Sequence, residues 1–147
     1  MEIEIKEFPD LNLEELYEIL QLRSEIFVVE QDCVYQDIDG KDQKALHILG
    51  KKEGKIVAYT RCFDNGFYFE EAAIGRVLVK MEERKYGYGH KIMQASIAAI
   101  KERFKTENIK LSAQQYLIKF YESHGFSTTG EGYLEDGIPH IAMVKTS

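Results

Sequence analysis

The chain has 147 residues, the length of one small domain, and is 44% hydrophobic and 30% charged. This composition supplies enough apolar residues for a buried core and excludes a disordered chain. The formal net charge of −6 argues against a nucleic-acid-binding protein, and no apolar run reaches the roughly 18 residues of a membrane-spanning helix. We therefore expect a single domain, residues 1–147, that binds neither nucleic acid nor membrane.

The first third of the chain predicts a strand, a helix and a long loop. Residues 2–6 alternate apolar and charged side chains, as in a half-buried strand, and lack the basic start and apolar block of a signal peptide. Asn12 and Glu15 have the spacing of a helix capping box, and apolar residues at helical intervals extend the predicted helix over 13–29. The polar stretch 30–44 is expected to form a long loop.

The middle of the chain predicts three strands. Apolar runs at 45–52 and 55–63 flank Glu-Gly at 53–54, which is the signal of a hairpin. A turn at 64–66 then leads to a further strand at 73–80.

The last third predicts two helices and two strands. A helix is expected at about 89–105, a strand at 108–113, and a second helix at about 115–124. Gly125 follows that helix as the glycine of a Schellman ending does, and 140–144 is the closing strand. The order β-α-β-β-β-α-β-α-β predicts an α/β fold whose first half is mostly antiparallel.

Cysteine and acidic patterns point away from a metal site. Cys33 and Cys62 have no metal-ligand spacing and are too few for a disulfide framework. The acidic stretch 37–42 lacks the ligand spacing of a calcium-binding loop. Two free thiols suit a reducing compartment, so we expect a cytoplasmic protein without a metal. Whether the Cys33 thiol is exposed and reactive is not decided by the sequence.

The stretch R-K-Y-G-Y-G-H-K at 84–91 lies between a predicted strand and a predicted helix. Gly87 and Gly89 carry no Cβ atoms, so a ligand can approach the backbone, and the first N–H groups of the helix favour an anion. The spacing matches neither a Walker loop nor a Rossmann fingerprint. The pattern indicates a pyrophosphate site, with a glycine turn that merely starts a helix as the alternative.

The spacing R-x-x-G-x-G at Arg84, Gly87 and Gly89 resembles motif A of the GNAT N-acetyltransferases. Residues 117–126, L-I-K-F-Y-E-S-H-G-F, resemble motif B of the same superfamily. The segments that resemble its ElaA-like branch are 22–40, 47–50, 74–79 and 135–143. The resemblance implies the GNAT acyl-CoA N-acyltransferase fold, a mixed central sheet with flanking helices.

The resemblance also implies acetyl-CoA as co-substrate and a set of residues that bind it. Main-chain groups that would contact the pantetheine arm fall on Val77, Leu78 and Val79. Groups that would bind the pyrophosphate fall on Arg84, Lys85, Tyr86, Gly87, Tyr88, Gly89 and His90. Many members place Asn at the start of the motif B helix, whereas this chain has Gln114, whose longer amide is expected to contact pantetheine.

Tyr121 matches the usual general acid of the family, which protonates the CoA thiolate as it leaves. The alternative reading is a core tyrosine on an amphipathic helix. The implied reaction is direct transfer to a primary amine in a ternary complex, with the oxyanion held by a backbone N–H near Val79.

The acceptor side is less defined by the sequence. Candidates for the base that deprotonates the amine are Glu30, Asp37, Asp39, His47 and His140. Arg76 interrupts an apolar strand and either anchors an acceptor carboxylate or pairs with an acid. The acidic stretch 30–42 indicates a cationic acceptor such as a polyamine or a lysine.

Two alternatives to the N-acetyltransferase remain at this point. The sequence also leaves a homodimer possible. The domain can bind acyl-CoA without turnover, as a sensor. It can also act like an acyl-homoserine lactone synthase, whose R-x-x-x-F and acidic patterns are loosely similar to Arg23, Phe27, Asp37, Asp39 and Asp42.

Overall fold

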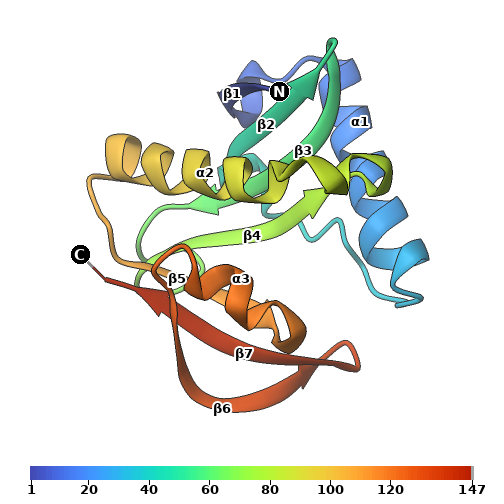
Figure 1. Ribbon diagram of the computed structural model, residues 1–147. Helices are drawn as coiled ribbons and strands as arrows, with labels where there is room; N and C mark the ends of the chain where they lie inside the picture. The colour runs from blue at the N-terminus through green and yellow to red at the C-terminus, as the bar shows by residue number, and fades with distance from the viewer. Residues whose placement is uncertain (147) are drawn as a thin grey trace.

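The computed structural model describes residues 1–146 as a seven-stranded mixed sheet with helices on both faces (Figure 1). The strands are β1 (Glu2–Glu7), β2 (Leu46–Lys52), β3 (Lys55–Phe63), β4 (Ala72–Val79), β5 (Ile109–Gln114), β6 (Ser127–Glu135) and β7 (Ile138–Lys145). Their order in the sheet is β1-β2-β3-β4-β5-β7-β6. Only β4 and β5 pair in parallel. The predicted mixed sheet with flanking helices is confirmed.

Two helical layers bury the two faces of the sheet. The helices are α1 (Leu13–Arg23), α2 (Tyr88–Phe104) and α3 (Ile118–Glu122). On one face α2 packs Ile92 and Met93 against β-strand residues such as Ile48. On the other face α1 packs Ile19 against Leu49. Ile48 and Leu49 are adjacent in β2, so their side chains point to opposite faces. No helix within residues 1–146 combines the length and apolarity needed to cross a membrane.

The predicted helix at 13–29 has the expected start but a different second half. The Glu15 N–H donates to Asn12 Oδ1 at 2.8 Å and the Asn12 N–H donates to Glu15 Oε1 at 3.0 Å, so the capping box is confirmed. After Arg23 the chain continues as the π-helix η2 (Ser24–Glu30). Apolar spacing does not distinguish one helical winding from the other, and π-turns are often found at functional sites.

The end of α3 agrees with the prediction, but the helix begins three residues later than predicted. Gly125 has φ +92°, the Phe126 N–H donates to the Tyr121 carbonyl at 3.2 Å, and the Gly125 N–H donates to the Glu122 carbonyl at 3.0 Å. These are the two bonds of a Schellman ending. The predicted start at 115 is a separate turn of 3-10 helix, η5 (Gln115–Leu117).

The strand β6 was not predicted from the sequence. All nine of its residues are exposed, and its sequence, STTGEGYLE, contains two glycines and few apolar side chains. It therefore lacks the alternation by which a half-buried strand is recognised. It is an edge strand that pairs only with β7, and their Asp136-Gly137 turn makes a hairpin of the last two strands.

The site of interest arises because β4 and β5 diverge. They pair only at their first residues, Ala72 with Ile109 and Ala73 with Lys110. Further along β4, Arg76 has φ +50° and the register with β3 shifts at this point, which is a β-bulge. The bulge turns the second half of β4 away from β5 and opens a wedge in the sheet (Figure 1).

Candidate active site

A cavity of about 700 Å³ occupies the wedge between β4 and β5. The predicted site residues that line it are Glu30, Arg76, Val77, Leu78, Val79, Arg84, Gly87, Gly89, His90, Gln114, Tyr121 and His140. Those that do not line it are Asp37, Asp39, His47, Lys85, Tyr86 and Tyr88. The fold thus brings residues from the whole length of the chain to one place.

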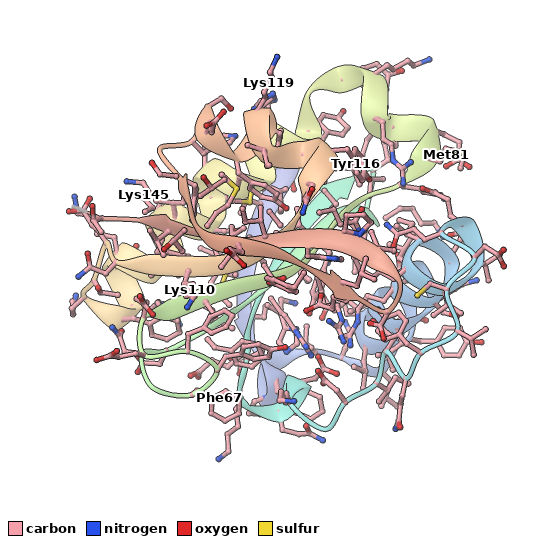
Figure 2. All side chains as sticks on the ribbon, turned by 90° about the horizontal axis from the view of Figure 1, so that it is seen from below. Phe67, Met81, Lys110, Tyr116, Lys119 and Lys145 are labelled. Carbon is pink, nitrogen blue, oxygen red and sulfur yellow. The ribbon has the colours of Figure 1, made fainter. Side chains whose placement is uncertain are left out.

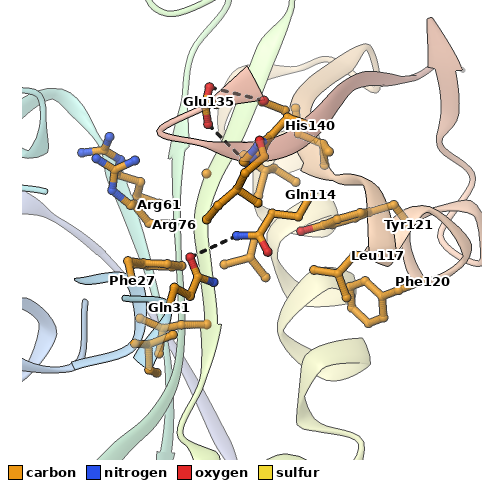
Figure 3. Close-up of a pocket in the computed structure, with 18 of the residues that line it drawn as sticks. Phe27, Gln31, Arg61, Arg76, Gln114, Leu117, Phe120, Tyr121, Glu135 and His140 are labelled. Atoms are coloured by element: carbon orange, nitrogen blue, oxygen red, sulfur yellow. Dashed lines mark hydrogen bonds and ion pairs between the residues drawn. The ribbon is translucent and has the colours of Figure 1, made fainter. Parts of the chain in front are cut away.

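Tyr121 reaches this cavity from α3 (Figure 3). The residue is only 5% exposed, and its ring is held edge-on by Phe120 and Phe126, with centroids 5.1 and 6.2 Å away. Within residues 1–146 its hydroxyl forms no hydrogen bond. Burial raises the pKa of Tyr121 above its ordinary value, so the phenol keeps its proton at neutral pH. It is a protonated donor that faces the cavity.

Val79 offers main-chain groups to the cavity. The Lys80 N–H donates to the Val57 carbonyl at 2.8 Å, so the neighbouring pair, Val79 and Ala58, does not exchange ladder bonds. The N–H and carbonyl of Val79 therefore point toward β5, which has already diverged, and the carbonyl accepts from Arg84 Nε at 3.0 Å. By the same alternation Leu78 directs its main chain to β3, so the prediction for Leu78 main-chain groups is wrong.

The glycine stretch contains a short helix before the turn. A 3-10 helix, η4 (Met81–Tyr86), precedes Gly87, whose φ of +73° favours glycine. The first backbone bond of α2 joins the Lys91 N–H to the Gly87 carbonyl at 3.4 Å. The N–H groups of the three residues between them, 88–90, belong to the first helical turn and have no partner within the helix.

Gly89 is not explained by the packing of the chain itself. Its φ is not positive, and a Cβ atom there would lie 3.4 Å from the Phe120 ring, an ordinary contact. An alanine would therefore fit in the folded chain. The absence of a side chain on the first turn of α2 instead leaves the backbone open to a ligand.

Residues 30–33, which we call the strap, cross the cavity with three side chains. Arg84 donates from Nη1 and Nη2 to the two Glu30 oxygens at 2.9 and 3.0 Å. Gln114 Nε2 donates to Gln31 Oε1 at 3.3 Å (Figure 3). A third contact joins Cys33 Sγ to the Asp136 carbonyl at 3.3 Å. Cys33 is buried, which settles the exposure that the sequence left open.

The comparison with known families decides what this site belongs to. A family model described as an acetyltransferase (GNAT) domain matches residues 9–147. The chain belongs to the GNAT acetyltransferase family. Its members are acyl-CoA-dependent acyltransferases, so the cavity of this GNAT protein is the place where an acyl-CoA and an acceptor are expected to meet.

Individual relatives support the same assignment. A UPF0039 protein of Schizosaccharomyces pombe is 41% identical over 145 residues, which cover 97% of this chain and 95% of that protein. Protein ElaA of Escherichia coli is 41% identical over 138 residues, 92% of this chain and 90% of ElaA. The predicted ElaA-like resemblance is confirmed.

Solved structures confirm the GNAT fold. The crystal structure of an acyl-CoA N-acyltransferase from Pseudomonas aeruginosa matches with a TM-score of 0.93 and 38% identity, covering 99% of this chain and 100% of that one. The crystal structure of Escherichia coli ElaA matches with a TM-score of 0.91 and 39% identity, covering 98% of each chain.

A largely buried network of three arginines and three aspartates adjoins the cavity of this GNAT protein. The arginines are Arg23 on α1, Arg61 on β3 and Arg76 on β4, and the aspartates are Asp37, Asp39 and Asp42. Asp42 Oδ1 accepts from Arg23 Nη1 at 2.7 Å and from Arg61 Nη1 at 3.0 Å. Burial alone would raise the pKa of Asp42, but the hydrogen bonds from these arginines lower it by more.

The network contradicts the expectation that the acidic stretch 30–42 attracts a cationic acceptor. Arg23 Nε donates to Asp37 Oδ2 at 2.8 Å, and Arg61 Nη1 donates to Asp39 Oδ1 at 2.9 Å. Arg76 Nε lies 2.8 Å from Asp37 Oδ1, so Arg76 pairs with an acid rather than standing free for an acceptor carboxylate. These aspartates are matched by arginines and do not supply free negative charge for a cationic acceptor.

Of the two candidate histidines, His47 has a structural environment. It is fully buried, with Nδ1 2.6 Å from the Tyr59 hydroxyl and Nε2 2.9 Å from the Asp42 carbonyl. Burial lowers its pKa, so the ring is neutral. Both nitrogens are occupied and the residue does not reach the cavity, so His47 has no path to an acceptor.

His140, in contrast, lines the cavity, and its two ring nitrogens have different partners. Nδ1 lies 2.7 Å from the Ile138 carbonyl, which only accepts, so Nδ1 carries the proton. Nε2 lies 3.4 Å from Glu135 Oε2 (Figure 3). The sequence analysis named His140 but not Glu135, because Glu135 lies on the strand β6 that it missed.

The backbone of His140 is held in place by a side chain from η5. Gln115 Nε2 donates to the His140 carbonyl at 3.0 Å. The Gln115 amide passes over Gly132, where a Cβ atom would come within 2.3 Å of Nε2. A side chain at position 132 would therefore displace Gln115.

Proposed function

We propose that this GNAT protein is an N-acetyltransferase that moves the acetyl group of acetyl-CoA to a primary amine by direct transfer in a ternary complex. One observation carries the proposal: the hydroxyl of the buried residue Tyr121, unpaired within residues 1–146, shares a single cavity with His140 and with the main chain of Val79. A proton donor, a proton acceptor and an N–H donor are the groups that aminolysis of a thioester needs.

The residues of the cavity suit CoA. The free N–H groups of Gly89 and His90, which line the cavity, and the bare backbone at Gly89 would hold the pyrophosphate. The main chain of Val79 and the amide of Gln114 would contact the pantetheine arm. When bound, acetyl-CoA supplies an activated acyl group as a thioester.

The proton movements can be assigned to residues of this chain. His140 Nε2 takes the proton of the acceptor ammonium, because Nδ1 is held as a donor by the Ile138 carbonyl. The Val79 N–H donates to the acyl oxygen as negative charge develops there. Tyr121 gives its proton to the sulfur as the carbon–sulfur bond breaks. The amine nitrogen forms the new bond to the acyl carbon, and the second proton that it loses restores the Tyr121 hydroxyl.

Two measurements test the proposal. Titration calorimetry with acetyl-CoA, CoA and dephospho-CoA measures binding, and release of free thiol in the presence of primary amines measures transfer. We expect both binding and amine-dependent thiol release. Binding without release under any amine would instead favour a non-catalytic acyl-CoA sensor.

The acyl-homoserine-lactone-synthase alternative gains no support from the site. Arg23, Asp37 and Asp42, which carry the similarity, are buried and pair with one another. Their pattern has a structural explanation, so no second function is proposed on it.

A further inference from the structure

The end of the cavity remote from the glycine stretch indicates which class of amine it accepts. We propose that the acceptor is an amine with a single positive charge and a flat apolar body, and that polyamines and lysine-rich peptides are poor acceptors. This inference rests on the proposed acetyltransferase function and names its substrate class.

An aromatic wall lines this end of the cavity. Phe63, Tyr68 and Phe69 all contribute to the lining. The rings of Phe63 and Tyr68 stack with centroids 5.5 Å apart, and Phe69 meets Tyr68 edge-on at 5.0 Å. Tyr68 is 44% exposed, so much of its ring remains uncovered. A flat apolar group is the natural partner of such a wall.

A carboxylate is available for one ammonium group, beside His140. Glu135 lines the cavity and its side chain is 51% exposed. Its contacts are His140 and Ser112, and across residues 1–146 no lysine or arginine forms an ion pair with it. Since the aspartates of the network are matched by arginines, Glu135 is well placed to draw the amine toward His140 Nε2.

The outer rim of the aromatic wall is already positive. Lys41 Nζ lies 5.5 Å from the centre of the Tyr68 ring, and Lys110 Nζ lies 5.1 Å from the centre of the Phe69 ring. Neither lysine has an ion-pair partner in the described part of the chain. Figure 2 shows Lys110 and the loop that carries Phe67 on the same side of the molecule.

The deeper aromatic rings also carry cations from the chain. The Arg61 guanidinium lies 5.2 Å from the Phe63 ring centre, and the Arg76 guanidinium lies 5.5 Å from that of Tyr35. A second ammonium on the acceptor would therefore meet like charge where it would otherwise find a ring face. The arrangement admits one cation, at Glu135, and repels another at the rim.

Three amines separate these features when titrated into the CoA-saturated protein by calorimetry. Hexylamine and 1,6-diaminohexane differ only in the second cation, and 2-phenylethylamine adds a flat ring. We expect 2-phenylethylamine to bind most tightly and 1,6-diaminohexane to bind at least about tenfold more weakly than hexylamine. Equal or tighter binding of the diamine, or no binding of any of the three, would overturn the inference.

Two variants with the same charge change locate the effect. Lys110→Glu should reduce the ratio of the dissociation constants of 1,6-diaminohexane and hexylamine at low salt, because it removes a rim cation. Lys55→Glu, at the exposed β2–β3 turn, is the control and should leave the ratio unchanged. If both variants change this ratio equally, the effect is one of general charge, and the rim lysines do not discriminate against the second ammonium.

Binding and turnover separate this inference from the proposed function. If diamines are acetylated fastest, the substrate class is wrong and the acetyltransferase stands. If 2-phenylethylamine binds as expected but no amine releases thiol, the acetyltransferase is wrong and the amine site stands.

Discussion

Replacing Tyr121 by phenylalanine removes a single oxygen atom from the centre of the candidate site. The ring would keep its contacts with Phe120 and Phe126, whose centroids lie 5.1 and 6.2 Å away. The hydroxyl has no hydrogen-bond partner within residues 1–146, so its loss leaves no buried group unsatisfied. We therefore expect a free energy of unfolding within about 0.5 kcal/mol of the wild type.

The effect on catalysis should be far larger than the effect on the fold. A positioned general acid typically contributes about 10²–10⁴ in rate. At roughly 1.36 kcal/mol for each factor of ten, Tyr121→Phe should raise the activation barrier by about 2.7–5.4 kcal/mol. The dissociation constant for CoA should change by no more than about threefold, because the assigned role is in proton transfer and not in binding.

The pH profile adds a second test of the same role. Burial raises the pKa of Tyr121 above its ordinary value of 10.0. The acid is present below this raised pKa and is lost only as the pH rises through it. Deprotonation of Tyr121 should therefore cause no decline of the wild-type kcat between pH 7 and the ordinary pKa of tyrosine.

The assay is release of free thiol, with CoA binding measured separately by calorimetry. Tyr116→Phe is the matched control, because Tyr116 also lines the cavity but is 76% exposed and has no assigned proton transfer. A Tyr121→Phe enzyme with nearly normal kcat, or one whose kcat and CoA affinity fall together, would refute the general acid.

Three further changes test other parts of the structure. Gly89→Val should weaken CoA binding at least about tenfold in calorimetry by crowding the bare first turn of α2, and unchanged affinity would contradict a pyrophosphate site there. Asp42→Asn should lower the free energy of unfolding in urea by about 3–5 kcal/mol, because it leaves Arg23 and Arg61 less compensated in the interior; a loss below about 1 kcal/mol would contradict the network. The pKa of Glu15 is lowered to about 2, because hydrogen bonds from two lysines and the Asn12 backbone together outweigh burial. Its ionised form therefore stabilises the fold above its ordinary pKa of 4.5 and loses this effect as the pH falls toward 2, so the stability difference from Glu15→Gln should close over that range. A difference that persists at pH 2 would contradict the shift.

The features that the sequence predicted well are those encoded by near neighbours in the chain. Asn12 and Glu15 form the capping box, and Gly125 ends α3, because each depends on bonds across three to five residues. The glycine spacing before α2 is equally local, and it led to the family. Position along the chain is sufficient information for such motifs.

The features that the sequence did not predict depend on distant partners or on exposure. β6 has no buried face, so no apolar alternation marks it. Glu135 lies on that strand, and its place in the candidate site depends on the β6–β7 hairpin, which brings it to His140. The acids of the 30–42 stretch were read as free charge, because nothing in their own segment shows that Arg23 and Arg61 lie opposite them.

The same arginine–aspartate network gives the acidic stretch a different role in the site. Arg76 forms the bulge in β4 with a left-handed φ of +50°, a conformation that costs a non-glycine residue about 1–2 kcal/mol. Asp37 and Asp39 both lie within ion-pair distance of its guanidinium, at 2.8 and 3.5 Å, and hold it in place. The bulge in turn separates β4 from β5 and leaves the Val79 N–H without a partner on β5. Under the proposed function, the acidic stretch would act through the shape of the sheet beside the cavity, and not through attraction of the acceptor.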